Sequence, residues 1–210
     1  MKLHLNRQRK GFTLIEILIV VGVLAFLAAG MWQATAYIQS RSMRTTAETQ
    51  VQLLEASVNA YRADNAGYLP DGRGDEVSSN VMYEMLSRDE DNDGEPDDEN
   101  GEVQMPYCES FYVVSSKDTE QQEGIPVVKV RIKGSGGTKN ARGKVYVIMD
   151  PWGNTYRYRL GYEGQTESGK TGNGMNPDFD IFSLGPDGRG NGRTNDGDNE
   201  DNISNVKSWK

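Results

Sequence analysis

The hydrophobic and polar positions first set apart a long apolar run near the N-terminus. Residues 12–31 hold one charged side chain, that of Glu16, in a segment otherwise made almost entirely of apolar and small residues. A helix of this length is about 30 Å long, which matches the hydrocarbon thickness of a bilayer. The pattern therefore predicts a transmembrane or filament-embedded helix.

The pattern changes after residue 31 but still favours a helix. No proline or glycine occurs between residues 31 and 67. Apolar residues recur at helical spacing among polar neighbours: Ala47, Val51, Leu54, Val58 and Tyr61. We expect one helix over residues 13–63, whose second half packs this stripe against a globular head.

Strand-like segments dominate the remainder of the chain. They are rich in Val, Ile, Tyr and Phe and lie at 111–114, 127–132, 144–149, 155–160 and 178–184. Alternation of apolar and polar residues is clearest in the second and fourth segments, as in a sheet with one covered face. The sequence therefore predicts an α+β fold in which the long helix lies across a small antiparallel sheet.

Charge and rare residues narrow the classes of function. The net charge of -8 argues against nucleic acid as a partner, because phosphate binding needs clustered Lys and Arg. His4 is the one histidine and Cys108 the one cysteine, so an intrachain disulfide is impossible. If the apolar run crosses a membrane, His4 lies on the opposite side from the head. Histidine-dependent catalysis is then excluded in the head, and we expect no enzyme activity.

A basic leader precedes the apolar run. It carries four cations and no acid: Lys2, Arg7, Arg9 and Lys10. This arrangement keeps the N-terminus in the cytoplasm and sends the rest of the chain across the membrane. The stretch KGFTLIE at 10–16 resembles the type IV prepilin signal. That resemblance implies cleavage between Gly11 and Phe12 by a membrane prepilin peptidase, followed by N-methylation of Phe12.

Glu16 has two interpretations. A carboxylate inside an apolar helix is costly and usually marks a functional pairing. After cleavage, the free ammonium of Phe12 on a neighbouring subunit is a suitable partner, so that Glu16 serves filament assembly. The alternative is that Glu16 only complements the positive end of its own helix dipole, worth about 0.3–1 kcal/mol. The adjacent Gly11 and Phe12 favour the assembly role.

Further segments resemble the major pseudopilins of type II secretion systems. These are LLEASVNAYRADNAGYLP with the following VMYEMLS, the turn DPWGNTY, and the loop start SLGPDG. The resemblance implies a type IV pilin-like fold with a C-terminal calcium loop. Its expected parts are a cleaved leader (1–11), a transmembrane helix (12–31) and a head (32–210). Within the head we expect the second half of the helix (32–66), an insertion (87–143), and the sheet with the calcium loop (144–210).

The C-terminal loop at 183–203 is the first candidate metal site. Calcium prefers six to eight oxygen ligands, and a glycine-rich acidic loop can supply them. The resemblance implies Ca²⁺ ligands among Leu184 (its carbonyl), Asp187, Asp198, Asp201 and Asn202. The alternative is a solvated acidic tail.

A second candidate metal site lies in DEDNDGEPDDEN at 89–100. Asp89, Asp91 and Asp93, followed by a glycine, fit the first positions of an EF-hand-like loop, with Asp97 at the ninth. The twelfth position holds Asn100 in place of glutamate. This segment is either a calcium loop or a merely solvated insertion.

Together these features predict a structural subunit of a periplasmic filament, anchored in the inner membrane by a single pass. The implied partners are further copies of the chain, minor pseudopilins, the inner-membrane secretion platform and the prepilin peptidase. Such a filament drives protein export across the outer membrane. Alternatives are a type IV pilin for adhesion or motility, or a signal-anchored periplasmic calcium-binding module. The lack of a C-terminal cysteine pair counts against the pilin.

Overall fold

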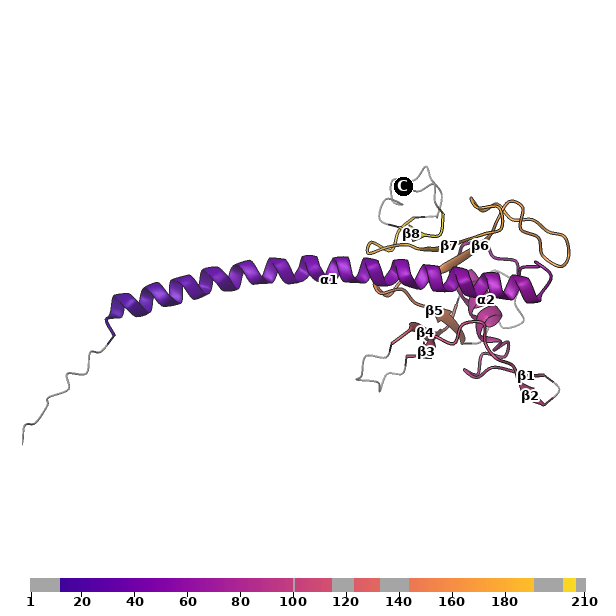
Figure 1. Ribbon diagram of the computed structural model, residues 1–210, viewed down its shortest axis with the longest axis horizontal. Coiled ribbons are helices and arrows are strands. Elements are labelled where there is room, and N and C mark those ends of the chain that lie inside the picture. The colour runs from indigo at the N-terminus through magenta and orange to yellow at the C-terminus, as the bar shows by residue number, and fades with distance from the viewer. Residues whose placement is uncertain (1–11, 100, 115–122, 133–143, 191–201, 207–210) are drawn as a thin grey trace, which may run out of the picture. The chain divides into compact units, whose positions relative to one another are not determined.

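The computed structural model describes residues 12–99, 101–114, 123–132, 144–190 and 202–206 (Figure 1). The chain divides into two units, Met1–Ser42 and Met43–Lys210. Helix α1 (Leu14–Asp64) begins and ends within one residue of the predicted bounds. No helix in the described parts of the chain is both long and apolar enough to cross a membrane.

The second half of α1 buries the predicted apolar stripe. Ala47, Val51, Leu54 and Val58 are at most 2% exposed, and Tyr61 is half-buried at the edge of the same core. Each fully buried aliphatic side chain contributes about 1.5–3 kcal/mol to folding. Most other core residues come from α2 and from strands β4 to β8, and Leu69, Cys108 and Tyr156 come from connecting segments. Residues 47–61 of α1 thus share one core with the rest of the head.

A second helix, α2 (Glu76–Ser87), was not predicted as a separate element. Asp75 caps its N-terminus, where the carboxylate accepts a hydrogen bond from Ser78 N at 3.0 Å. Arg88 ends the helix in the left-handed conformation, with φ 58°, and its N–H donates to Glu84 O at 3.1 Å. Both caps hold α2 in place between the end of α1 and the acidic loop that follows.

The strands form three small sheets. β1 (Asp98–Glu99) and β2 (Glu102–Val103) make a hairpin. A second sheet has the order β3 (Phe111–Val113), β4 (Ile125–Val130) and β5 (Val145–Ile148). A third has the order β6 (Arg157–Leu160), β7 (Phe179–Ser183) and β8 (Ile203–Ser204). Figure 1 shows the β1–β2 hairpin close to the C-terminal end of α1.

The prediction of one antiparallel sheet was wrong in two respects. The strands belong to separate sheets, and β3 pairs with β4 in parallel, with Phe111 opposite Ile125. Ile125 N donates to Ser110 O at 2.8 Å, which fixes this direction. Gly124 precedes the strand with φ 128°, and a Cβ there would lie 2.3 Å from Ser110 O, so only glycine allows this approach.

The alternation in β6 also misled the sequence analysis. A sheet with one covered face would expose every second residue, yet Arg159 is only 4% exposed. Its guanidinium lies over the Phe182 ring, 5.2 Å from the centroid. The arginine is therefore part of the interior of the third sheet, where an aromatic face receives its charge.

Candidate functional site

The first turn of α1 holds a reciprocal hydrogen-bonded cap. The carboxylate of Glu16 accepts hydrogen bonds from Thr13 N at 2.8 Å and from Thr13 Oγ1 at 2.9 Å. In return, Glu16 N donates to Thr13 Oγ1 at 3.3 Å. This is a capping box, in which Thr and Glu three residues apart satisfy each other's backbone donors. Gly11 lies outside the described residues.

Sequence reasoning missed this role of Glu16, although the signal was present. The letters TLIE at 13–16 carry the Thr-x-x-Glu pattern that announces a helix start. The pairing of Glu16 with the ammonium of a neighbouring Phe12 stays a prediction. The Phe12 side chain is 84% exposed.

Large apolar side chains are exposed throughout residues 12–27. Eleven lie in the turns after Phe12 and remain more than half accessible: Leu14, Ile15, Ile17, Leu18, Ile19, Val20, Val21, Val23, Leu24, Phe26 and Leu27. Soluble monomers rarely expose an apolar surface this continuous, and such surfaces mark contacts with protein or lipid. In a single copy of the chain, these apolar side chains are not buried against other residues.

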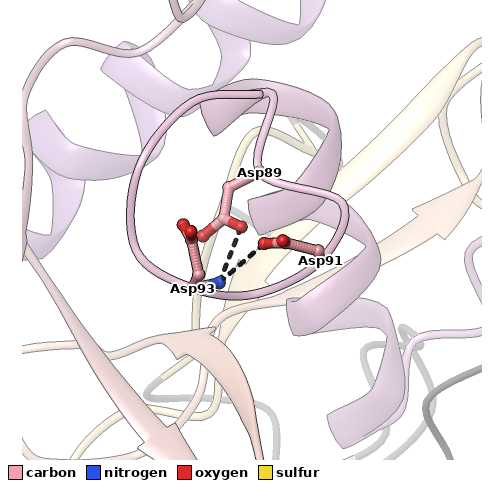
Figure 2. Close-up of side chains that lie close together, drawn as sticks. All are labelled: Asp89, Asp91 and Asp93. Atoms are coloured by element: carbon pink, nitrogen blue, oxygen red, sulfur yellow. Dashed lines mark hydrogen bonds between the residues drawn. The ribbon is translucent and has the colours of Figure 1, made fainter. Parts of the chain in front are cut away.

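The acidic loop at 89–94 brings three predicted ligands together. One carboxylate oxygen from each of Asp89, Asp91 and Asp93 lies within 4.8 Å of the others (Figure 2). Asp89 is fully buried and accepts hydrogen bonds from Asp93 N at 3.0 Å and Gly94 N at 2.9 Å. Asp91 accepts from the same Asp93 N at 3.0 Å, so the loop winds around its own carboxylates.

Asn92 anchors this loop in the core and was not anticipated. It is 3% exposed, and its side-chain oxygen accepts from Asn80 Nδ2 and from Tyr146 N, each at 2.9 Å. Its amide nitrogen donates to Glu84 Oε1 at 2.7 Å. Lys129 Nζ donates to the Asn92 carbonyl at 2.5 Å. The loop is therefore fastened to α2 and to strands β4 and β5 of the second sheet.

Burial disfavours the charged forms of two carboxyl groups at this loop. It raises the pKa of Asp89 in the loop and of Glu84 in α2, because the ionised carboxylates lose solvation. Tyr83 Oη donates to Asp89 Oδ2 at 2.6 Å. Burial raises the pKa of the Tyr83 phenol, and this hydrogen bond raises it further. A cation among these carboxylates would offset the cost of keeping them ionised.

Asp97 does not join the three clustered carboxylates. Its Oδ2 accepts from Glu90 N at 2.6 Å, and its own N–H donates to Arg88 O at 2.7 Å. Asp97 thus closes the base of the loop, where the sequence analysis placed a ninth-position metal ligand. Asn100 lies outside the described residues.

The C-terminal loop is described only at its two ends. Leu184 is buried, and the Asp187 carboxylate accepts a hydrogen bond from Arg189 N at 2.8 Å. Asn202, which immediately precedes β8, is 8% exposed. Asp198 and Asp201 lie outside the described residues, so the ligand set of this loop stays a prediction.

The turn DPWGN holds the first end of the C-terminal loop. Asp150 is 3% exposed and accepts hydrogen bonds from Trp152 N, Asn154 N and Ser183 Oγ, at 3.0, 2.8 and 2.5 Å. Ser183 Oγ accepts in turn from Gly185 N at 2.9 Å. Asn154 Nδ2 donates to Gly185 O at 2.8 Å. The sequence analysis gave this turn no link to the loop, but it positions the backbone around Leu184.

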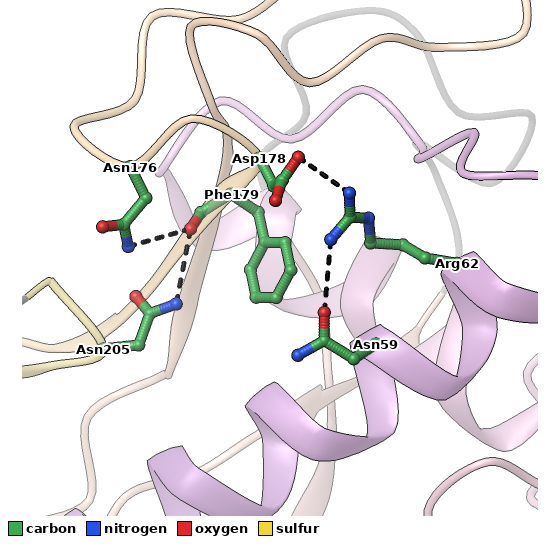
Figure 3. A network of polar contacts seen from close by, with 6 residues as sticks. All are labelled: Asn59, Arg62, Asn176, Asp178, Phe179 and Asn205. Carbon is green, nitrogen blue, oxygen red and sulfur yellow. Dashed lines mark hydrogen bonds and ion pairs between the residues drawn. The ribbon is translucent and has the colours of Figure 1, made fainter.

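A polar network secures the strand that precedes this loop (Figure 3). Arg62 of α1 donates to Asp178 Oδ1 at 2.7 Å and lies over the Phe179 ring, 6.0 Å from its centroid. Asn176 and Asn205 both donate to the Phe179 carbonyl, at 3.1 and 3.3 Å. The start of β7 is therefore fixed to α1 on one side and to the segment after β8 on the other.

Comparisons with known proteins give two findings. Residues 6–32 match the prokaryotic N-terminal methylation motif. The chain is 26% identical over 196 residues to Type II secretion system core protein G of Pseudomonas aeruginosa, covering 92% of this chain and 94% of that protein. No solved structure gives a significant match. The chain thus carries a prepilin-type methylation motif and is similar, along nearly its whole length, to a major pseudopilin, which confirms the resemblance predicted from its sequence.

Proposed function

We propose that the chain is a structural subunit that polymerises into the pseudopilus of a type II secretion system. The observation that carries this proposal is the position of the methylation motif, residues 6–32, over the segment that exposes its apolar side chains. A filament of further copies supplies the packing that this segment lacks in one copy. Head-to-tail contacts that do not close generate such open helical assemblies.

The apolar segment at 12–31 is proposed to anchor the subunit in the inner membrane before assembly, with the head in the periplasm. Support comes from its length, its exposed side chains and the basic leader before it. Minor pseudopilins, the inner-membrane platform and the prepilin peptidase are the proposed partners. The role is structural, with no catalytic step assigned to the head.

The test of maturation is the intact mass of the full chain expressed with and without a prepilin peptidase. We expect a peptidase-dependent loss of residues 1–11 and the gain of one methyl group on Phe12. An uncut chain, or a cut after the apolar run, contradicts the proposal.

The test of assembly separates the two roles of Glu16. Glu16→Gln keeps a side-chain acceptor for Thr13 N but removes the charge, whereas Glu16→Ala removes both. If the charge pairs with a neighbouring Phe12 ammonium, both variants lose filaments in a shearing assay. Assembly by Glu16→Gln at the wild-type level would mean that the cap alone matters. Glu48→Gln, an exposed carboxylate paired with Arg44 on the same helix, is the control.

We also propose that the head binds calcium, as a structural ion that neutralises clustered carboxylates. Asp89, Asp91 and Asp93 suit this ion chemically, because they are hard oxygen donors held within 4.8 Å of one another. The proposed ligands at the C-terminal loop remain Leu184, Asp187, Asp198, Asp201 and Asn202. Bound calcium would supply positive charge there and no reaction.

Calorimetric titration of the chelator-treated chain with CaCl₂ tests the metal proposal. We expect Asp91→Asn to remove one binding event and Asp187→Asn to remove another. If one of the two variants shows no binding heat at all and the other binds normally, the chain has one calcium site, in the loop that carries the first variant's substitution. Absence of binding to the wild-type chain would contradict both sites.

A further inference from the structure

A groove of about 1080 Å³ runs beside the C-terminal end of α1. One side is formed by the last turn of α1 and by α2, and the other by residues within 88–99 and 104–107. This second wall belongs to the predicted insertion at 87–143, for which the sequence suggested only a calcium loop. The groove does not depend on the apolar N-terminal residues.

The wall formed by the insertion is held rigidly. Asn92 fastens it to α2 and to β5, and Asp97 closes the base of its acidic loop. The β1–β2 hairpin extends the wall, with Asp98 paired to Val103. A surface fixed before binding loses little conformational entropy when a partner arrives.

The charge of the groove is one-sided. Seven carboxylates line it, against a single guanidinium, that of Arg88. Asp64 lies 3.9 Å from this guanidinium, whereas no ion pair among the described residues involves Asp98 or Glu99, which are both exposed. The potential of the groove therefore attracts cations.

Arg88 shows how the groove accommodates a guanidinium. Its charged group lies over the Tyr107 ring, 4.5 Å from the centroid, and donates to Tyr107 Oη at 2.7 Å. Tyr61 contacts the same ring edge-on, with centroids 5.4 Å apart, and also lines the groove. Aromatic faces next to carboxylates are the surroundings that arginine prefers at interfaces.

We propose that this groove docks an extended, arginine-containing segment of a partner protein. Arginine side chains of the partner stack against Tyr61, next to the Tyr107 ring that Arg88 covers, and pair with the carboxylates of Asp98 and Glu99. A second copy of the chain is the poorer occupant, because each copy carries a net charge of -8. The proposal goes beyond the filament role and gives the insertion a recognition function.

The test is binding of a fluorescein-labelled nonapeptide of alternating arginine and alanine, measured by anisotropy. The full chain is kept in uncharged detergent with EGTA at physiological ionic strength, where nonspecific attraction is screened. The groove variant is Asp64→Asn/Asp98→Asn/Glu99→Gln, and the charge-matched control is Glu109→Gln/Glu123→Gln/Glu163→Gln. All six positions are exposed, and the control positions lie outside the groove.

We expect the groove variant to weaken peptide binding about tenfold and the control to leave it nearly unchanged. The corresponding lysine peptide should bind more weakly, because lysine cannot stack and bridge in one plane. Equal losses in the two variants would show attraction by net charge alone and overturn the proposal. So would equal binding of both peptides, or no binding to the wild-type chain. Neither assembly nor maturation enters this measurement, so it fails or succeeds independently of the filament proposal.

Discussion

The loop at 89–97 and the turn at 183–188 are both acidic and contain glycine, yet the fold holds them in opposite ways. The first is held by its own residues, since Asp89 and Asn92 point inward and are nearly inaccessible. The second is held from outside, by Asp150 and Asn154 of a separate turn, while its own Asp187 makes one local bond. Two segments of similar composition are therefore anchored by residues in different places. In the first loop the anchors lie within the acidic pattern, and in the second they lie about 30 residues before it.

Removing the inward anchor of the first loop should have the largest effect. Asn92→Ala leaves the buried donors Asn80 Nδ2 and Tyr146 N without their acceptor and strips Glu84 of its donor. We expect the free energy of unfolding to fall by about 3–4 kcal/mol, measured by urea denaturation. Asn65→Ala, at an exposed position, should cost less than about 1 kcal/mol. Equal losses of stability in the two variants would contradict the anchoring role of the buried Asn92.

Removing the outside anchor of the second turn should cost somewhat less. Asp150→Ala leaves the donors of Trp152, Asn154 and Ser183 unsatisfied at a buried site. We expect a loss of about 2–3 kcal/mol, together with lower calcium affinity at the C-terminal loop. Full stability in this variant would mean that the turn and the loop are not coupled.

The raised pKa of Asp150 predicts how the free energy of unfolding changes with pH. Burial raises its pKa above the ordinary 3.8, despite the hydrogen bonds that oppose the shift. The folded state therefore holds this proton at a pH where the unfolded chain has released it. The wild-type chain should lose stability, relative to Asp150→Asn, as pH rises from about 4 through the raised pKa. Parallel denaturation series in EGTA measure this difference, and a constant gap between the two proteins would contradict it.

The smallest effect on stability is expected at Asp187. Its carboxylate is exposed and accepts one local hydrogen bond, so Asp187→Asn should change the calcium-free stability by less than about 0.5 kcal/mol. The stabilisation by added calcium should shrink in the same variant. Thermal unfolding with EGTA and with calcium separates the two quantities. A large loss in EGTA would place Asp187 among the anchors.

The sequence predicted the parts of the fold that depend on local periodicity. Helix α1 could be placed within a residue because no proline occurs in it, no glycine occurs between residues 31 and 67, and its apolar stripe repeats at helical spacing. The pairing of β3 with β4 could not be predicted, since strand direction depends on partners distant in the chain. Arg159 was misplaced because its burial requires the Phe182 ring on a neighbouring strand.

The candidate site followed the same division. The spacing of Asp89, Asp91 and Asp93 predicted their convergence, because an Asp-x-Asp-x-Asp-Gly run winds around its own side chains. The role of Asn92 was not predicted, because nothing in the sequence distinguishes a buried polar residue from its exposed neighbours in an acidic segment. Asp97 matched a ligand position in spacing, but its side chain closes the loop through Glu90 N.

The cap at the start of α1 uses one of the two oxygens of Glu16. Both hydrogen bonds that Glu16 accepts from Thr13 end on Oε2, whereas an ionised carboxylate has a second oxygen with lone pairs of its own. If Glu16 pairs with a neighbouring ammonium, as proposed, Oε1 can accept that partner while Oε2 keeps the cap. Capping and pairing are then compatible at the same side chain, and association costs no hydrogen bond at this turn.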